Sequence, residues 1–192
     1  MTLALSTTDE RGDELDVLER LYVSHGAQLR QTLARLAPEL DAGDLLHELF
    51  LVAIKKTGDF SAADDRLAWM YGVAVKLAAS RRRTARLRKF LGFRIETPEA
   101  LVDAPSRSME QRDAQRQVMR ALEPLSDAKR NVFVLFELQG LSGEEIAAAL
   151  GIPLKTVWTR LFHARREVTA AIDRQLLAES RTSGLNQQEL KR

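Results

Sequence analysis

The sequence predicts an all-α protein of two small helical domains joined by a flexible linker, the C-terminal one a helix-turn-helix. Apolar residues recur at helical spacing along most of the 192 residues, and no segment of useful length shows the two-residue alternation of a strand. Pro98 and Pro105 interrupt this periodicity near the middle of the chain. Residues 142–166 carry the caps and turn of a helix-turn-helix. Residues 1–13 and about 178–192 are polar and are predicted to be frayed tails.

The first predicted domain spans residues 14–94. Its apolar residues outline one helix or a helix pair over residues 15–36. Asp44 is expected to cap the next helix, and a polar loop over residues 58–65 separates it from a long helix at 66–90. That last helix is apolar in its first half and rich in arginine in its second. The apolar stripe of the helix after Asp44 consists of Leu45, Leu46, Leu49, Phe50, Ala53 and Ile54.

A predicted linker over residues 95–115 separates this domain from a second one at 116–175. The linker combines prolines, acids and serines, and it lacks apolar periodicity. In the second domain, Ser126 is expected to cap a helix that Gly140 ends, directly before the helix-turn-helix begins.

The helix-turn-helix is indicated by residues that begin, end and pack two helices. Ser142 and Glu145 have the spacing of a capping box, and Gly151 suits the left-handed residue that ends a helix. Pro153 precedes a second helix, whose inward stripe is predicted to be Val157, Leu161, Ala164 and Val168. Its outward side chains could donate to phosphates and base edges if the helix enters a major groove. These are Lys155, Thr156, Trp158, Thr159, Arg160 and His163. A plain helical hairpin with a solvated basic face is the alternative interpretation.

Charge is distributed unevenly along the chain, although the net charge is only +2. Residues 38–65 contain seven acids against two lysines, whereas residues 76–95 contain eight basic residues and no acid. This asymmetry indicates one surface for a protein partner and another for nucleic acid. A solvated helix end remains the simpler interpretation of the basic run.

Composition excludes several classes of site. The absence of cysteine excludes disulfides and thiolate zinc sites, and the three histidines lie far apart in sequence. No cofactor and no metal are therefore expected. No signal peptide is evident, and no stretch approaches the roughly 20 apolar residues of a membrane span, so we expect no membrane insertion and a cytoplasmic location.

Two segments together resemble the extracytoplasmic-function (ECF) sigma factors of bacterial RNA polymerase. Residues 44–50, DLLHELF, look like the family's D-L-x-Q-E-x-F motif, and residues 66–74 are similar to its "a-W-L-y-x-I-A" stretch. Residues 122–150 resemble the family's "L-P … V-F-x-L … G-L-S-x-E-E-I-A-x-x-L-G" pattern, and residues 156–166 match its recognition helix. The resemblance covers about residues 15–175. The family commonly has other residues at Gly72, Val75, Lys76, Ser80, Lys155 and Trp158, and it has glutamine at His47.

The resemblance implies a sigma factor without catalytic activity that brings RNA polymerase core to promoter DNA, and an anti-sigma factor that holds it inactive. The residues that it implies for core binding are Asp44, Leu45, His47, Glu48 and Phe50. Those implied for the downstream promoter element are Lys76, Arg81, Arg82, Arg83 and Arg86. Those implied for the upstream element are Lys155, Thr156, Trp158, Thr159, Arg160, His163 and Arg165.

Two alternative functions remain open from the sequence. A helix-turn-helix regulator that acts without core polymerase would use the same C-terminal domain and bind its operator as a dimer. An enzyme of nucleotide or nucleic-acid metabolism would need Asp41, Asp44 and Glu48 as metal ligands, because carboxylates one helical turn apart share a face.

Overall fold

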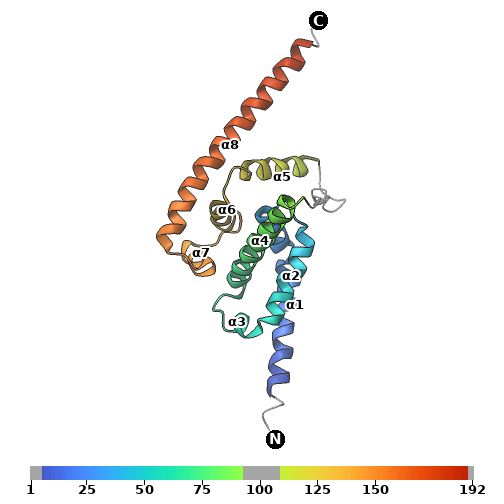
Figure 1. Ribbon diagram of the computed structural model, residues 1–192, viewed down its shortest axis with the longest axis vertical. Coiled ribbons are helices and arrows are strands. Elements are labelled where there is room, and N and C mark those ends of the chain that lie inside the picture. The colour runs from blue at the N-terminus through green and yellow to red at the C-terminus, as the bar shows by residue number, and fades with distance from the viewer. Residues whose placement is uncertain (1–5, 93–108, 190–192) are drawn as a thin grey trace.

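The computed structural model describes residues 6–92 and 109–189, and their side chains over 12–92 and 113–178. Every regular element within these residues is a helix, which confirms the predicted all-α class. Helices α1 to α4 form the N-terminal half and α5 to α8 form the C-terminal half (Figure 1). None of the described helices is long and apolar enough to span a membrane.

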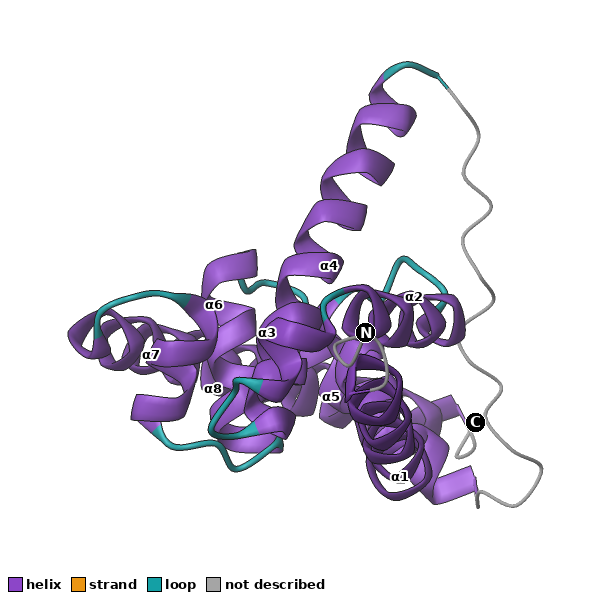
Figure 2. Ribbon diagram, turned by 90° about the horizontal axis from the view of Figure 1, so that it is seen from below, coloured by secondary structure: helices purple, strands orange, loops and turns teal. Residues whose placement is uncertain are grey.

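The N-terminal half contains α1 (Ser6–Leu36), α2 (Ala42–Lys55), α3 (Thr57–Ser61) and α4 (Arg66–Phe90). The bounds of α4 are those that the sequence predicted. Helices α1 and α2 pack against each other, and both pack against α4. The last turns of α4 project away from the other helices (Figure 2), and their side chains are exposed.

Two terminal predictions were wrong, because both end helices are longer than expected. Helix α1 is continuous through Gly26 and begins at Ser6, so most of the predicted tail at 1–13 is helical. Helix α8 likewise runs on to Glu189, through most of the other predicted tail. Neither helix contains a proline. A glycine within a helix costs only about 1 kcal/mol, which is too little to end one this long.

Two predictions around α2 also need correction. Its N-cap is Asp41 rather than Asp44, since the Asp41 carboxylate accepts a hydrogen bond from the Asp44 backbone N–H at 2.8 Å. The segment predicted as a polar loop contains α3, which forms because Phe60 is fully buried. The Phe60 ring meets Trp69 edge to face, with 5.7 Å between ring centroids.

The C-terminal half contains α5 (Met109–Leu122), α6 (Asp127–Phe133), a π-helical turn η1 (Val134–Leu138), α7 (Gly143–Leu150) and α8 (Leu154–Glu189). Helix α8 packs against α5, α6 and α7 before it extends beyond them (Figure 1).

The predicted linker lies largely outside the described residues, which resume at Met109. Its last residues, 109–115, belong to α5. Ser126 is the N-cap of α6, as predicted, although its side chain makes no capping hydrogen bond. Gly140 follows the π-helical turn with a φ of 74°, a left-handed conformation that ends the helix there.

The helix-turn-helix formed by α7 and α8 is confirmed in its details. The Ser142 hydroxyl accepts a hydrogen bond from the Glu145 N–H, and the Glu145 carboxylate accepts one from the Ser142 N–H. Gly151 ends α7 in the left-handed conformation, with a φ of 65°. The predicted inward stripe of α8 is buried at Val157, Leu161, Ala164 and Val168.

The buried apolar side chains of the two halves form one contiguous cluster, with α4 between them. Helix α4 contacts α1 and α2 on one side and α7 on the other (Figure 1). The halves are therefore packed together rather than merely tethered. The buried residues of α4 are Met70, Tyr71, Gly72, Ala74, Val75, Ala78 and Arg82.

Replacing Gly143 by alanine is expected to destabilise the helix-turn-helix. A Cβ at this position would lie 2.5 Å from Cζ2 of Trp158 and 3.0 Å from Cδ1 of Leu154, so the indole must move. We expect a loss of about 1–3 kcal/mol in the free energy of unfolding, the usual cost of overpacking. Chemical denaturation measures it, with Gly58→Ala as the control because nothing lies within 4 Å of a Cβ there. Equal unfolding free energies for both variants would contradict this packing.

Candidate nucleic-acid and protein interfaces

The exposed face of α2 contains fewer of the predicted partner-binding residues than the sequence suggested. Asp44 and His47 are exposed, whereas Leu45 and Phe50 are buried in the core of the N-terminal half. The Phe50 ring packs edge to face on Tyr22 of α1, 5.1 Å away. These two apolar side chains position the helix and do not reach its outer face.

Two apolar residues that were not predicted to bind a partner extend this face. Leu51 is 54% exposed, and Ile54, predicted to belong to the buried stripe, is 45% exposed. They follow His47 by four and seven residues and therefore lie on the same side of the helix. Their spacing from His47 could have predicted that Leu51 and Ile54 lie on this face. We call Asp44, His47, Leu51 and Ile54 the α2 face.

Glu48 is bound within the N-terminal half. Its carboxylate accepts hydrogen bonds from the Arg81 guanidinium of α4, with 2.8 Å between Nε and Oε2. This hydrogen bond, and then the charge of Glu48, raise the pKa of Arg81. The pair ties α2 to α4, so neither side chain presents an uncompensated charge to a partner.

A carboxylate metal site is not assembled at the start of α2. Asp41, one of the three ligands that the enzyme interpretation requires, caps the helix, and Glu48 binds Arg81. Among the residues with described side chains, no three histidines, aspartates or glutamates gather in a way that could hold a metal ion.

The structure divides the predicted cations of α4 into two groups. Lys76 and Arg83 are exposed and stand seven residues apart, on one side of the helix. Arg82 is 8% exposed and pairs with Glu39 at 2.6 Å and with Asp127 of α6 at 2.7 Å. The more exposed Arg86 also reaches Asp127, at 3.2 Å. Only the first group forms an open basic surface.

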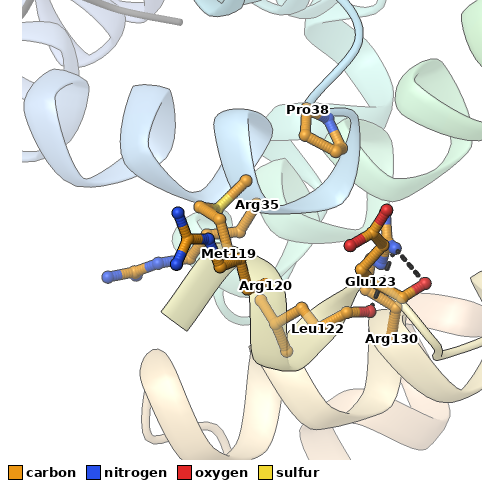
Figure 3. A pocket seen from close by; sticks show the side chains of 7 residues that line it. All are labelled: Arg35, Pro38, Met119, Arg120, Leu122, Glu123 and Arg130. Atoms are coloured by element: carbon orange, nitrogen blue, oxygen red, sulfur yellow. Dashed lines mark hydrogen bonds between the residues drawn. The ribbon is translucent and has the colours of Figure 1, made fainter. Parts of the chain in front are cut away.

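A cavity of about 250 Å³ lies where the halves meet, and its walls come from α1, α5 and α6 (Figure 3). Arg130 is buried here and donates from Nη2 to the carbonyl oxygens of Leu122 and Glu123, at 3.0 and 3.4 Å. Burial, and then the charge of Arg82, lower the pKa of Arg130. The residues that line the cavity are Arg35, Pro38, Met119, Arg120, Leu122, Glu123 and Arg130.

The predicted DNA-reading residues of α8 are not equally accessible. Lys155, Thr159 and His163 are exposed, as predicted. Thr156 and Arg160 are half-buried, because they border the inward stripe. They lie at the edge of the outward face rather than at its centre.

Trp158 and Arg165 also contact the rest of the C-terminal half. The Trp158 ring is 44% exposed but packs edge to face on Phe136, with 5.6 Å between centroids. The Arg165 guanidinium lies over the same Phe136 ring and donates to Glu137 at 2.6 Å. Both side chains therefore attach α8 to η1, in addition to any contact with DNA.

Phe162 and Arg166, which were not among the predicted site residues, complete the outward face of α8. The Phe162 ring is 57% exposed, with the Arg166 guanidinium 5.7 Å from its centroid and the His163 ring 5.4 Å away. Phe162 and Arg166 follow Lys155 by seven and eleven residues, a spacing that could have predicted them. We call Lys155, Thr159, Phe162, His163 and Arg166 the α8 face.

Comparison with known proteins supports the helix-turn-helix directly. Residues 115–168 match the model of the family described as "Sigma-70, region 4". The chain is 29% identical over 174 residues to the RNA polymerase sigma factor NccH of Alcaligenes xylosoxydans xylosoxydans, covering 88% of this chain and 93% of that protein. It is also 29% identical over 168 residues to the ECF RNA polymerase sigma-E factor of Escherichia coli K12, covering 83% of this chain and 87% of the relative.

Solved structures show the same fold. The sigma factor RpoE of Bartonella quintana, solved with the anti-sigma factor NepR, aligns with a TM-score of 0.65 at 23% identity, covering 82% of this chain and 97% of RpoE. CnrH, solved with the cytosolic domain of CnrY, aligns with a TM-score of 0.62 at 24% identity, covering 86% and 94%. Because the relatives match across both halves, they favour a sigma factor over a stand-alone helix-turn-helix regulator. The family match in the C-terminal half and the relatives that align across both halves support an ECF sigma factor, an alternative sigma factor that directs transcription initiation by RNA polymerase.

Proposed function

We propose that the two halves of this sigma factor divide the work of initiation. The first, at residues 14–94, binds polymerase core and the downstream promoter element, and the second, at 116–175, reads the upstream element. The observation that carries this division is that the exposed α2 face and α8 face lie in different halves. In this proposal the chain performs no catalysis and acts in the cytoplasm, where polymerase and promoter are found.

The α2 face suits a protein partner because it combines an acid with apolar residues. Asp44 and His47 supply polar contacts, while Leu51 and Ile54 supply apolar area that is exposed in the free chain. Interfaces of this kind have an apolar centre and a polar rim. We assign core binding to this face and give Leu45 and Phe50 a supporting role behind it.

The exposed cations of α4 suit a phosphate backbone. Lys76 and Arg83 lie on one side of the helix, and the last turns of α4 project beyond the other helices (Figure 2). Contacts of lysine and arginine with phosphates position DNA without reading its sequence. We therefore assign to α4 the positioning of the downstream element.

An anti-sigma factor is the further partner that we propose. Both solved structures named above are complexes, one with the anti-sigma factor NepR and the other with CnrY. Those two sigma factor chains align with this fold over 97% and 94% of their own length, which supports a partner of the same kind for this chain.

Exchanging Asp44 for lysine together with Leu51 for alanine is expected to weaken association with polymerase core. Both side chains are exposed, so the helix should remain folded while the partner loses one charge contact and one apolar contact. We expect the dissociation constant to rise about tenfold or more, which corresponds to about 1.4 kcal/mol. Binding of labelled core measures this, with circular dichroism to confirm helix content. The matched control is Leu15→Ala, another exposed leucine. Wild-type affinity in the double variant would place core binding elsewhere.

Removing the open cations of α4 is expected to flatten the salt dependence of promoter binding. For Lys76→Ala with Arg83→Ala, the slope of log K against log salt should fall by up to about 0.9 for each lost phosphate contact. The lifetime of the promoter complex at several salt concentrations measures it. Arg20→Ala with Arg174→Ala removes two exposed cations elsewhere and serves as the control. The solvated-face interpretation predicts an unchanged slope.

Base readout by α8 can be tested with Arg160→Ala and Phe162→Ala, each measured against a library of upstream elements. Arginine discriminates a guanine edge by about 1–3 kcal/mol, and an aromatic ring can pack on a thymine methyl. We therefore expect each variant to lose preference at one base position and transcription from the best promoter to fall about tenfold. Thr169→Ala, an exposed position further along α8, should change neither quantity. A uniform loss over all sequences would show that the residue contacts backbone only.

A further inference from the structure

The two halves are held together first by a backbone approach that only glycine allows. Gly72 of α4 is buried, and a Cβ built there would lie 2.7 Å from the carbonyl oxygen of Ala149 in α7 and 3.3 Å from its Cα. The obstructing atoms are backbone, so they can yield only if α7 moves as a whole. Any larger residue at position 72 is therefore incompatible with this packing of the halves.

A hydrogen-bond network joins the halves beside this contact, part-buried at Tyr71 and exposed at Gln28. The Tyr71 hydroxyl of α4 and the Gln28 amide of α1 both donate to Oε1 of Gln139, at 3.1 and 3.0 Å. Gln139 follows η1 in the C-terminal half. Burial raises the pKa of Tyr71 to about 12, so its hydroxyl keeps the proton that it donates.

The third contact is a cluster of charges. Arg82 bridges the halves, since it pairs with Glu39 of its own half and Asp127 of the other, and Arg86 pairs with Asp127 as well. Arg82 also donates to the Leu36 carbonyl oxygen at 3.2 Å. Buried Arg130 lies close enough for its pKa to respond to these charges. Two arginines thus share Asp127, the acid that the C-terminal half contributes, and Arg82 pairs with Glu39 as well.

We propose that these three contacts form an autoinhibitory latch, which closes the halves on each other and withholds Arg82 and Arg86 from DNA. The inference rests on the proposed function, in which α4 contacts promoter phosphates. In the closed chain, both guanidinium groups pair with Asp127 and Arg82 is buried as well, so a phosphate must compete with a carboxylate for them. The apparent affinity for DNA is then reduced in proportion to the fraction of open molecules.

In the same arrangement, DNA binding favours separation of the two halves. A ligand that binds the open state better shifts the population toward it, by as much as its affinities for the two states differ. A phosphate that takes the place of Asp127 leaves Arg82 paired and removes the charge attraction across the junction. Contact with DNA and separation of the halves are thereby coupled.

Two variants open the latch by different routes. Gly72→Gln removes no charge and places a good helix former where only glycine fits, so it separates α4 from α7. Asp127→Asn keeps the shape of the side chain but leaves Arg82 with Glu39 alone and takes from Arg86 its carboxylate partner. The matched controls are Gly58→Gln, where a Cβ meets nothing within 4 Å, and Asp113→Asn, an exposed carboxylate on α5.

The distance between the halves can be measured in the full-length chain, because it contains no cysteine of its own. Cysteines introduced at the exposed positions Glu19 and Thr169 carry a donor and an acceptor dye, one in each half. Both latch variants should lower energy transfer while the controls keep the wild-type value, and added duplex DNA should lower it in the wild type. Energy transfer that stays at the wild-type value in both variants overturns the latch.

Affinity for a duplex of random sequence is then measured for the same proteins. If nine-tenths of the chain is closed, opening raises the affinity about tenfold, and Gly72→Gln shows this without any change of charge. Separation of the halves with no gain in affinity overturns the inhibitory role. The double variant Lys76→Ala with Arg83→Ala separates failure of the proposed function from failure of the latch. It alters the slope of DNA affinity against salt only if α4 contacts DNA. The distance between the dyes reports on the latch whether or not α4 contacts DNA.

Discussion

The burial of α4 between the two halves is the constraint on which the rest of the structure depends. Its apolar first half completes the core with α1 and α2, and the same stretch of helix meets α7 through Gly72. Both halves therefore contribute to one continuous apolar cluster. The hydrophobic effect is roughly proportional to the apolar area removed from water, so separating the halves carries a cost that another interaction must offset.

This packing gives the cations of α4 different roles. A helix that is buried on two sides still exposes a strip, and Lys76 and Arg83 lie on it. Arg82 falls on the buried side, where its charge is tolerated only because two carboxylates and a carbonyl oxygen surround it. A run of basic residues that is uniform in sequence thus contains both a surface for phosphates and an internal ion pair.

Aromatic rings have a comparable double role in the C-terminal half. Trp158 and Phe162 stand one turn apart on α8, yet Trp158 packs on Phe136 and against the start of α7, while Phe162 points outward. The first fixes the angle between the two helices of the helix-turn-helix. The second is free to meet a base. Position on the helix relative to η1, rather than residue type, separates these roles.

The sequence by itself determined the all-α class, the bounds of α4 and the helix-turn-helix, because caps, left-handed glycines and apolar stripes are local signals. The capping box at Ser142, the turn at Gly151 and the full extent of α4 followed from neighbours only a few residues away. The sequence did not reveal α3, since the burial of Phe60 depends on Trp69 of another helix. Nor did it show that Ile54, in the predicted apolar stripe, is exposed together with Leu51. The pairing of Arg82 with Asp127, 45 residues away in sequence by the difference of their numbers, was decided by tertiary structure alone. Ion pairs between two domains produce no regular spacing in the sequence, because the way in which two packed surfaces meet decides which charges pair.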